Sequence, residues 1–289
     1  MKKMNLKLTL VVMSVGVIFS TFISCGKSND EPTSKNLSFT ANGVTFEMIF
    51  VEKGSFTMGC TPEQGDGNAD EKPPHPVTLT EDYYMGKYEV TQKLWHAVTG
   101  NSINYQRSLA SASSLNGEGD NFPMYYINYD ECVAFCTALN GLLGGQLPAG
   151  YTFNLPTEAQ WEYAARGGKK SVGYKYSGSH DVNTIAWYGN GDESLSTHPV
   201  GTKLQNELGI YDMSGNVWER CRDWYSNTYY STISSGAINP TGPPTGTTCV
   251  LRGGCWYNFE KGVRVSQRIN VYPITRYDGT GLRLALVKN

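Results

Sequence analysis

The chain of 289 residues is long enough for one large domain or two small ones, and its formal net charge is only −2. This balance excludes a charge-driven attraction to nucleic acid or to an anionic membrane surface. Only 17% of the residues are charged, whereas 32 are Gly, 19 are Tyr and 6 are Trp. We therefore expect a loop-rich globular protein with few long solvated helices, held together by aromatic packing.

The N-terminus has the pattern of a bacterial lipoprotein signal. A basic start precedes an apolar run that is short for a membrane span and ends just before Cys25. We expect residues 1–24 to be the signal peptide, residues 25–38 a flexible tether with an acylated Cys25, and residues 39–289 the folded domain. The expected location is the bacterial cell envelope, lipid-anchored in a membrane, with the outer-membrane surface as one option. The alternative is an ordinary secreted protein with a chance cysteine.

The first part of the domain has the alternation of half-buried strands. Apolar and polar residues alternate over residues 37–58, with turn signals at Asn42-Gly43 and Lys53-Gly54. Residues 77–79 and 83–85 are predicted as two further short strands. These runs indicate small antiparallel sheets.

Three segments carry helix signals. Residues 91–98 begin with a threonine cap, and residues 129–143 have apolar side chains at helical spacing. Residues 157–166 begin with Thr157, whose capping-box partner is Gln160. Residues 101–122 have no periodicity and are predicted as a long loop. No internal repeat divides the chain, which favours a single domain.

Six short motifs follow one another in a fixed order. They are residues 54–59 (GSFTMG), 88–91 (YEVT), 155–168 (LPTEAQWEYAARGG), 209–219 (GIYDMSGNVWE), 251–256 (LRGGCW) and 281–285 (GLRLA). Together they resemble the formylglycine-generating-enzyme, or sulfatase-modifying factor, family over about residues 39–287. The resemblance implies an α+β domain, a variant of the C-type lectin fold with little regular secondary structure.

Residues 209–219 are the best candidate for a metal site. Gly215 permits a sharp turn, so that the carboxylates of Asp212 and Glu219 can face one point. Hard oxygen ligands on a bent backbone suit Ca²⁺. The alternative is a turn in which Asp212 caps its own backbone. The resemblance implies a structural Ca²⁺ site at Asp212, Gly215, Val217 and Glu219, and a second one at Asp192 and Asn183.

The copper site of the active enzymes is not expected here. By resemblance, two cysteines after the Arg-Gly-Gly motif bind Cu⁺, which activates O₂ to oxidise a sulfatase cysteine. Counted from Gly254, their positions hold Asn258 and Val263. A substitute pair of Cys249 and Cys255 would require the chain to fold back, because six strand residues span about 20 Å. The six cysteines after the lipidation site also permit up to three disulfides in an exported protein.

Two functional hypotheses follow. The first is a non-catalytic ligand-binding or structural lipoprotein that keeps the family scaffold. The second is an oxidoreductase that converts a sulfatase cysteine to formylglycine, with Cys255 in the catalytic role. The loss of both copper ligands favours the first hypothesis, because function depends on the site rather than on the fold.

Residues 256–279 form the candidate recognition surface, next to the place where the resemblance puts the family's peptide groove. The segment combines aromatic side chains with arginines, which are typical of binding surfaces. The expected ligand is a protein, a peptide or a glycan. Alternatively, the aromatics are core residues and the arginines pair with Asp223, Glu260 or Asp278. The candidate ligand-binding residues are Trp256, Tyr257, Asn258, Phe259, Arg264, Arg268, Tyr272, Arg276 and Tyr277.

Overall fold

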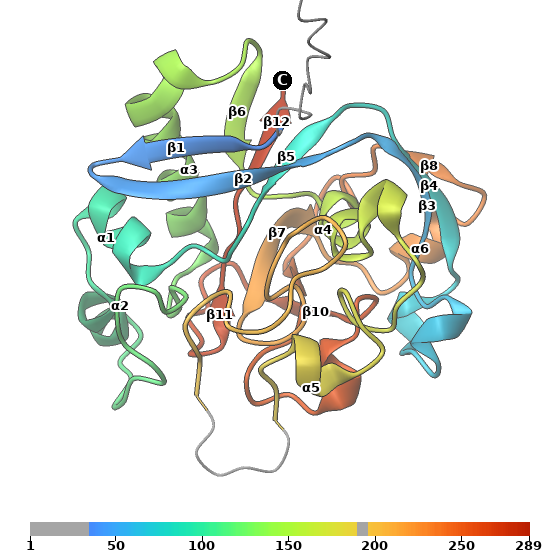
Figure 1. The fold of residues 1–289 in the computed structure, drawn as a ribbon. Coiled ribbons are helices and arrows are strands. Elements are labelled where there is room, and N and C mark those ends of the chain that lie inside the picture. Colours follow the sequence, from blue (N-terminus) through green and yellow to red (C-terminus); the bar gives the residue numbers. More distant parts are fainter. Residues whose placement is uncertain (1–34, 190–195) are drawn as a thin grey trace, which may run out of the picture. The chain divides into compact units, whose positions relative to one another are not determined.

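A computed structural model describes residues 35–189 and 196–289 (Figure 1). The predicted signal peptide, Cys25 and Asp192 lie outside the described residues. Residues 35–289 form one compact unit of mixed α and β structure, as predicted. In the described part of the chain, no helix is long and apolar enough to cross a membrane.

The first and last strands of the domain share a five-stranded antiparallel sheet, so both ends of the described chain stabilise the same layer. Its order is β1 (Leu37–Ala41), β2 (Val44–Val51), β5 (Tyr83–Gly86), β12 (Ala285–Lys288) and β6 (Tyr151–Asn154). The predicted turn between β1 and β2 is confirmed: Asn42 and Gly43 both have positive φ angles, of 46° and 82°. Two such residues in sequence are what a tight two-residue hairpin requires.

Two smaller sheets contain the other strands of the described residues. One has the order β10 (Arg268–Val271), β9 (Cys249–Arg252), β7 (Trp218–Trp224) and β11 (Thr280–Gly281). The other has the order β3 (Gly54–Met58), β4 (His75–Leu79) and β8 (Ala237–Ile238). The predicted strands at residues 37–58, 77–79 and 83–85 are therefore present.

All but the last of the α-helices in the described residues begin after a residue whose side chain caps the first turn. They are α1 (Gln92–Thr99), α2 (Ile103–Leu109), α3 (Tyr129–Leu143), α4 (Glu158–Ala165), α5 (Val182–Ile185) and α6 (Tyr229–Thr232). The predicted capping box of α4 is confirmed, since Thr157 and Gln160 exchange both bonds. The prediction of a loop over residues 101–122 is wrong at α2. There, the Ser102 side chain accepts a hydrogen bond from the Tyr105 amide and caps a helix too short to show a periodic pattern.

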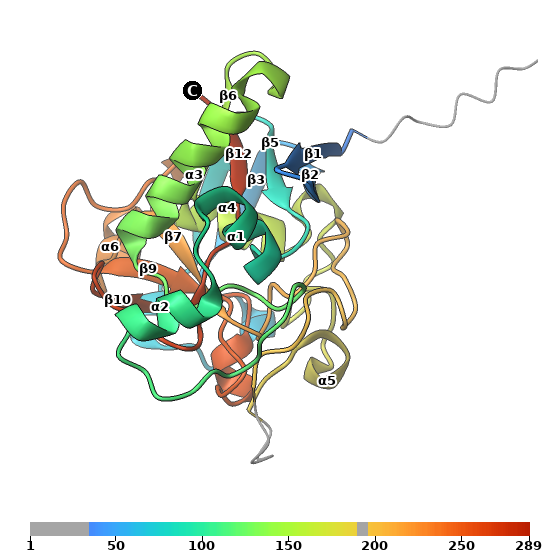
Figure 2. The same cartoon turned by 90° about the vertical axis from the view of Figure 1, so that its left-hand side faces the viewer.

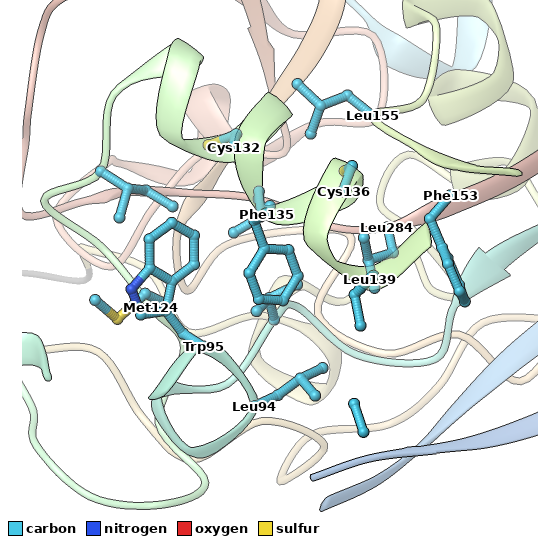
Figure 3. Packing of buried hydrophobic residues seen from close by; sticks show 14 of the residues in the cluster. Leu94, Trp95, Met124, Cys132, Phe135, Cys136, Leu139, Phe153, Leu155 and Leu284 are labelled. Atoms are coloured by element: carbon cyan, nitrogen blue, oxygen red, sulfur yellow. The ribbon is translucent and has the colours of Figure 1, made fainter. Parts of the chain in front are cut away.

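The largest core lies between α3 and the five-stranded sheet. Figure 2 shows α3 running beside β6 and β12. Phe135 of α3 stacks on Trp95 of α1 at a ring distance of 5.0 Å, and Phe153 of β6 and Leu284, just before β12, join the same cluster (Figure 3). A second core surrounds Trp161 of α4.

The possibility of disulfides is not realised in this structure. Each of the six cysteines among the described residues is a buried free thiol. Figure 3 shows two of them, Cys132 and Cys136, within the apolar cluster around α3. There they act as small apolar side chains.

Candidate functional site

A glycine turn directs the candidate recognition segment out of the four-stranded sheet. After β9, Gly253 and Gly254 adopt φ angles of 96° and 78°. A Cβ on Gly254 would lie 2.5 Å from the carbonyl oxygen of Gly262, so only glycine fits this close approach. The chain then passes through a 3₁₀ turn, Glu260–Val263, and returns to the sheet as β10.

The aromatic side chains of residues 256–279 face solvent. The exposed fraction is 75% for Phe259, 63% for Tyr272, 54% for Tyr277 and 40% for Tyr257, whereas Trp256 is half-buried. The alternative that these side chains are core residues is therefore wrong for the first four. Ile274, which the sequence reasoning did not single out, is 79% exposed on the same segment. Five large apolar or aromatic side chains of this one segment are therefore exposed, and side chains of these types are common at interaction surfaces.

The arginines of the same segment face the interior, so two of the predicted ligand-binding residues need correction. Arg264 and Arg268 are each only 1% exposed. Arg264 donates to both oxygens of Glu71 at 2.8 Å. Arg268 binds the two oxygens of Glu158 at 2.7 and 2.8 Å. Neither side chain is available to an external ligand in this arrangement.

Arg276 is also engaged within the protein. Its side chain is 17% exposed and forms an ion pair with Glu131. It also donates to Gln106 Oε1 at 3.0 Å and to the Tyr126 carbonyl at 3.1 Å. The partners of the arginines are thus glutamates of distant segments, rather than the carboxylates proposed in the alternative.

A buried ion-pair network lies directly beneath this segment. Arg252 of β9 binds Glu158 at 3.1 Å and Glu162 at 2.5 Å, and both glutamates belong to α4. Burial alone would raise the pKa of Glu158, but the charges of Arg268 and Arg252 outweigh it and hold that pKa below its usual value. The network therefore ties α4 to β9 and β10.

The predicted calcium centre has the predicted bend but a different set of contacts. Gly215 has a φ of 90°, and a Cβ there would lie 2.2 Å from the Trp187 carbonyl oxygen. Glu219 accepts hydrogen bonds on both carboxylate oxygens, from Arg283 at 2.6–3.0 Å and from Trp161 Nε1 at 2.6 Å. Asp212 accepts one from the Gly201 amide at 2.7 Å.

Glu89 belongs to this centre, although sequence reasoning assigned it no role. It accepts hydrogen bonds from Asn216 Nδ2 at 2.6 Å and from the Val217 amide at 3.1 Å. Burial, together with the nearby charges of Asp212 and Glu219, raises its pKa well above the usual value. Burial also raises the pKa of Asp212 to about 6. The available signal was the motif of residues 88–91, whose glutamate is flanked by apolar and aromatic residues.

Of the three carboxylates, only Glu219 is paired directly with the guanidinium of Arg283, whose charge acts on Glu89 and Asp212 from a distance. The pKa values of Glu89 and Asp212 are raised, so these two groups are the ones whose ionised forms are not fully compensated. Over residues 35–189 and 196–289, however, no three His, Cys, Asp or Glu side chains converge closely enough to hold one metal ion. Of the second predicted site, Asn183 is exposed and bonded to Asp181 and the Tyr188 hydroxyl.

The positions expected for copper ligands hold residues that do not bind copper. Asn258 Oδ1 accepts hydrogen bonds from the Cys255 amide at 2.9 Å and from its thiol at 3.1 Å. Val263 is fully buried in an apolar cluster. Burial raises the pKa of Cys255 to about 12 and that of Cys249 to about 11, so both remain thiols at neutral pH. The two do not form a substitute thiolate pair.

Comparisons with known proteins cover most of the chain. The model of the sulfatase-modifying factor enzyme 1-like domain matches residues 34–288. The chaperone protein LppX of Paenibacillus barcinonensis is 30% identical over 278 residues, which cover 83% of this chain and 86% of that protein. The formylglycine-generating enzyme of Thermomonospora curvata is 32% identical over 206 residues, or 66% of this chain and 63% of the enzyme. Treponema denticola variable protein 1 superimposes with a TM-score of 0.72 at 30% identity, covering 88% of this chain and 99% of that one.

Proposed function

The chain belongs to the family of the sulfatase-modifying factor enzyme 1-like domain, and we propose that it is a non-catalytic ligand-binding member, carried on the cell envelope by a lipid on Cys25. The observation that supports this proposal is the division within residues 256–279. Its arginines are committed to internal glutamates, whereas four of its aromatic rings are exposed. Large rings with two rotatable side-chain bonds provide contact area at a low cost in conformational entropy.

The site chemistry supports recognition over oxidation. Both copper positions lack a sulfur ligand, and the nearby Cys255 is a buried thiol bonded to Asn258. These residues do not fit Cu⁺, which prefers thiolates. Copper content of the purified protein and oxygen consumption with a Cys-x-Pro-x-Arg peptide test the alternative, a sulfatase-activating oxidoreductase. Stoichiometric copper with peptide-dependent oxygen uptake would overturn the proposal.

The ligand class that we favour is a protein or peptide, with glycans as the other class to be tested. The relative named a chaperone matches this chain over 86% of its own length, which is consistent with a protein ligand. Tyrosine and phenylalanine side chains are also enriched at protein interfaces.

The test is a triple substitution, Tyr257→Ala, Phe259→Ala and Tyr277→Ala, probed on an array of surface proteins and glycans. The matched control is Ile238→Ala, because Ile238 is 72% exposed but lies on β8, away from this segment. We expect the triple variant to lose array binding while it keeps its melting temperature, and the control to keep both. A blank array with the unsubstituted protein, or unfolding of the triple variant, would contradict the proposal.

Calcium at the predicted centre also remains a proposal. The four predicted ligands do not fit Ca²⁺ in the arrangement described, because Arg283 and Trp161 already use both oxygens of Glu219. The raised pKa values of Glu89 and Asp212, in contrast, indicate that their ionised forms lack a counter-charge, which a bound cation would supply. We therefore propose that any Ca²⁺ bound here is held by Asp212 and Glu89 rather than by Glu219.

A further inference from the structure

Arg220 differs from the other deeply buried arginines of the protein. Among the described residues, Arg252, Arg264, Arg268 and Arg283 are each at most 1% exposed and paired with a glutamate. Arg220 of β7 is 0% exposed and forms no ion pair with a carboxylate in the described part of the chain. Its Nε and Nη1 atoms lack hydrogen-bond partners there as well.

A buried guanidinium without a counter-ion weakens the fold. Removing a charge from water costs free energy that only a partner charge and a full set of hydrogen bonds can offset. The pKa of Arg220 is lowered, chiefly by burial, in keeping with that cost. An apolar side chain of similar length would avoid it, so the contribution of Arg220 has to be sought in the two bonds that it does form.

Both bonds come from one nitrogen and join two segments that are distant in sequence. Arg220 Nη2 donates to the Ile127 carbonyl at 3.1 Å and to the Thr275 carbonyl at 2.7 Å. Ile127 lies just before α3, and Thr275 lies in the exposed loop that carries Tyr272, Ile274 and Tyr277. Arg220 therefore reaches from the interior of the sheet to the backbone of the recognition segment.

The same two segments are joined by further backbone bonds. The Tyr126 amide donates to the Tyr277 carbonyl at 3.1 Å, and the Tyr129 amide donates to the Pro273 carbonyl at 2.9 Å. Tyr126 has a φ of 59°, a left-handed conformation that is uncommon for a residue with a side chain. Such strain persists only where the surroundings hold the chain in place.

We propose that Arg220 is a positioning residue that fixes the loop of residues 272–277 before any ligand arrives. A loop that is already ordered loses less conformational entropy on binding, which strengthens the complex without adding a contact. The biological purpose of this ordering rests on the proposed recognition function. The contacts that Arg220 makes with the two backbone segments are a property of the free protein, so they are testable without a ligand.

The experiment compares Arg220→Met with Arg222→Met by amide hydrogen exchange and thermal unfolding. Arg222 lies two residues away on the same strand with an exposed side chain, so it is the matched control. We expect Arg220→Met to keep or raise the melting temperature, because it removes the unpaired charge. At the same time, exchange of the Tyr126, Tyr129 and Thr275 amides should rise by about tenfold or more, while the β1–β2 hairpin stays protected. Arg222→Met should change neither.

A conservative variant provides the rescue. Arg220→Lys keeps a cationic donor at the position, and we expect exchange of the loop amides to lie between the values for Arg220→Met and the unsubstituted protein. Unchanged loop exchange in Arg220→Met would overturn the proposal. So would a uniform rise in exchange with a lower melting temperature, since that identifies a purely structural residue. Because no ligand is used, a blank binding array would contradict the recognition function and leave this result standing.

Discussion

Residues 256–279 have an inner and an outer side that differ in residue type and in role. On the inner side, Arg264 and Arg268 are buried and each binds both oxygens of a glutamate. On the outer side, Phe259, Tyr272 and Tyr277 are more than half exposed. Arginine and aromatic residues are equally typical of binding surfaces, yet here only the aromatics are placed to meet a ligand. The arginines hold the segment against α4 and the 3₁₀ turn Ala69–Glu71.

The first prediction removes one inner arginine. Arg268→Ala leaves Glu158 buried with only Arg252 as a cationic partner, and breaking such a pair costs about 3–5 kcal/mol of unfolding free energy. Urea denaturation measures the loss. The control is Lys261→Ala, which removes an exposed cation of the same segment and should change stability by less than about 0.5 kcal/mol. Equal effects of the two variants would contradict the division between the two sides.

Much of the fold follows from local signals in the sequence. Thr157 and Gln160 mark the start of α4, and Asn42-Gly43 marks a hairpin, because each signal acts through neighbours within a few residues. The short helix α2 was missed although Ser102 caps it, since it has too few residues to show a periodic apolar face. The replacement of both copper ligands was also readable, because it concerns residue identity alone.

The candidate site was only partly predictable because its contacts are long-range. Arg264 is 193 positions from Glu71, and Arg268 is 110 positions from Glu158. Neither pairing leaves a periodic or local pattern, so the sequence predicted arginines on the surface. Glu89 reaches the predicted calcium centre from 127 positions away, through its contact with Asn216, and was missed for the same reason. A buried charge is identified by its partner, which only the tertiary structure supplies.

The second prediction concerns pH and Asp223, a buried residue of β7 that accepts a hydrogen bond from the amide of Glu158, the glutamate that pairs with Arg268. Burial, followed by the charge of Glu158, raises the pKa of Asp223 to about 8. Because the folded state then holds a proton that the unfolded state releases near pH 4, stability should fall as the pH rises from about 4 to 8, with a slope approaching about 1.4 kcal/mol per pH unit. Asp223→Asn should flatten this slope, whereas Asp66→Asn, at a fully exposed aspartate, should not. Identical pH profiles for both variants would contradict the assignment.

The third prediction concerns Ca²⁺, which would bind at the predicted centre around Asp212 and Glu89. It would leave the exposed aromatic rings of residues 256–279 unchanged. A ligand that binds only the folded state stabilises it, by about 2.7 kcal/mol at 100 times its dissociation constant. We expect the melting temperature to rise between excess chelator and millimolar Ca²⁺, and Glu89→Gln to reduce that rise. Glu47→Gln is the control, because Glu47 pairs with Lys87 on the surface. No shift in the unsubstituted protein would count against a calcium site at this centre.

The fourth and smallest stability effect is expected on the outer side. Phe259 is 75% exposed, so Phe259→Ala should change the unfolding free energy by less than about 0.5 kcal/mol. Phe135→Ala is the matched contrast: the same side chain is 1% exposed in the core, and its truncation should cost about 3–5 kcal/mol. If Phe259→Ala instead destabilised the domain by more than about 2 kcal/mol, the ring would be needed for the stability of the fold. That result would contradict the proposal that the outer side is a recognition surface. A near-neutral result would show that the ring is dispensable for folding and therefore free to contact a ligand, which the binding array then tests.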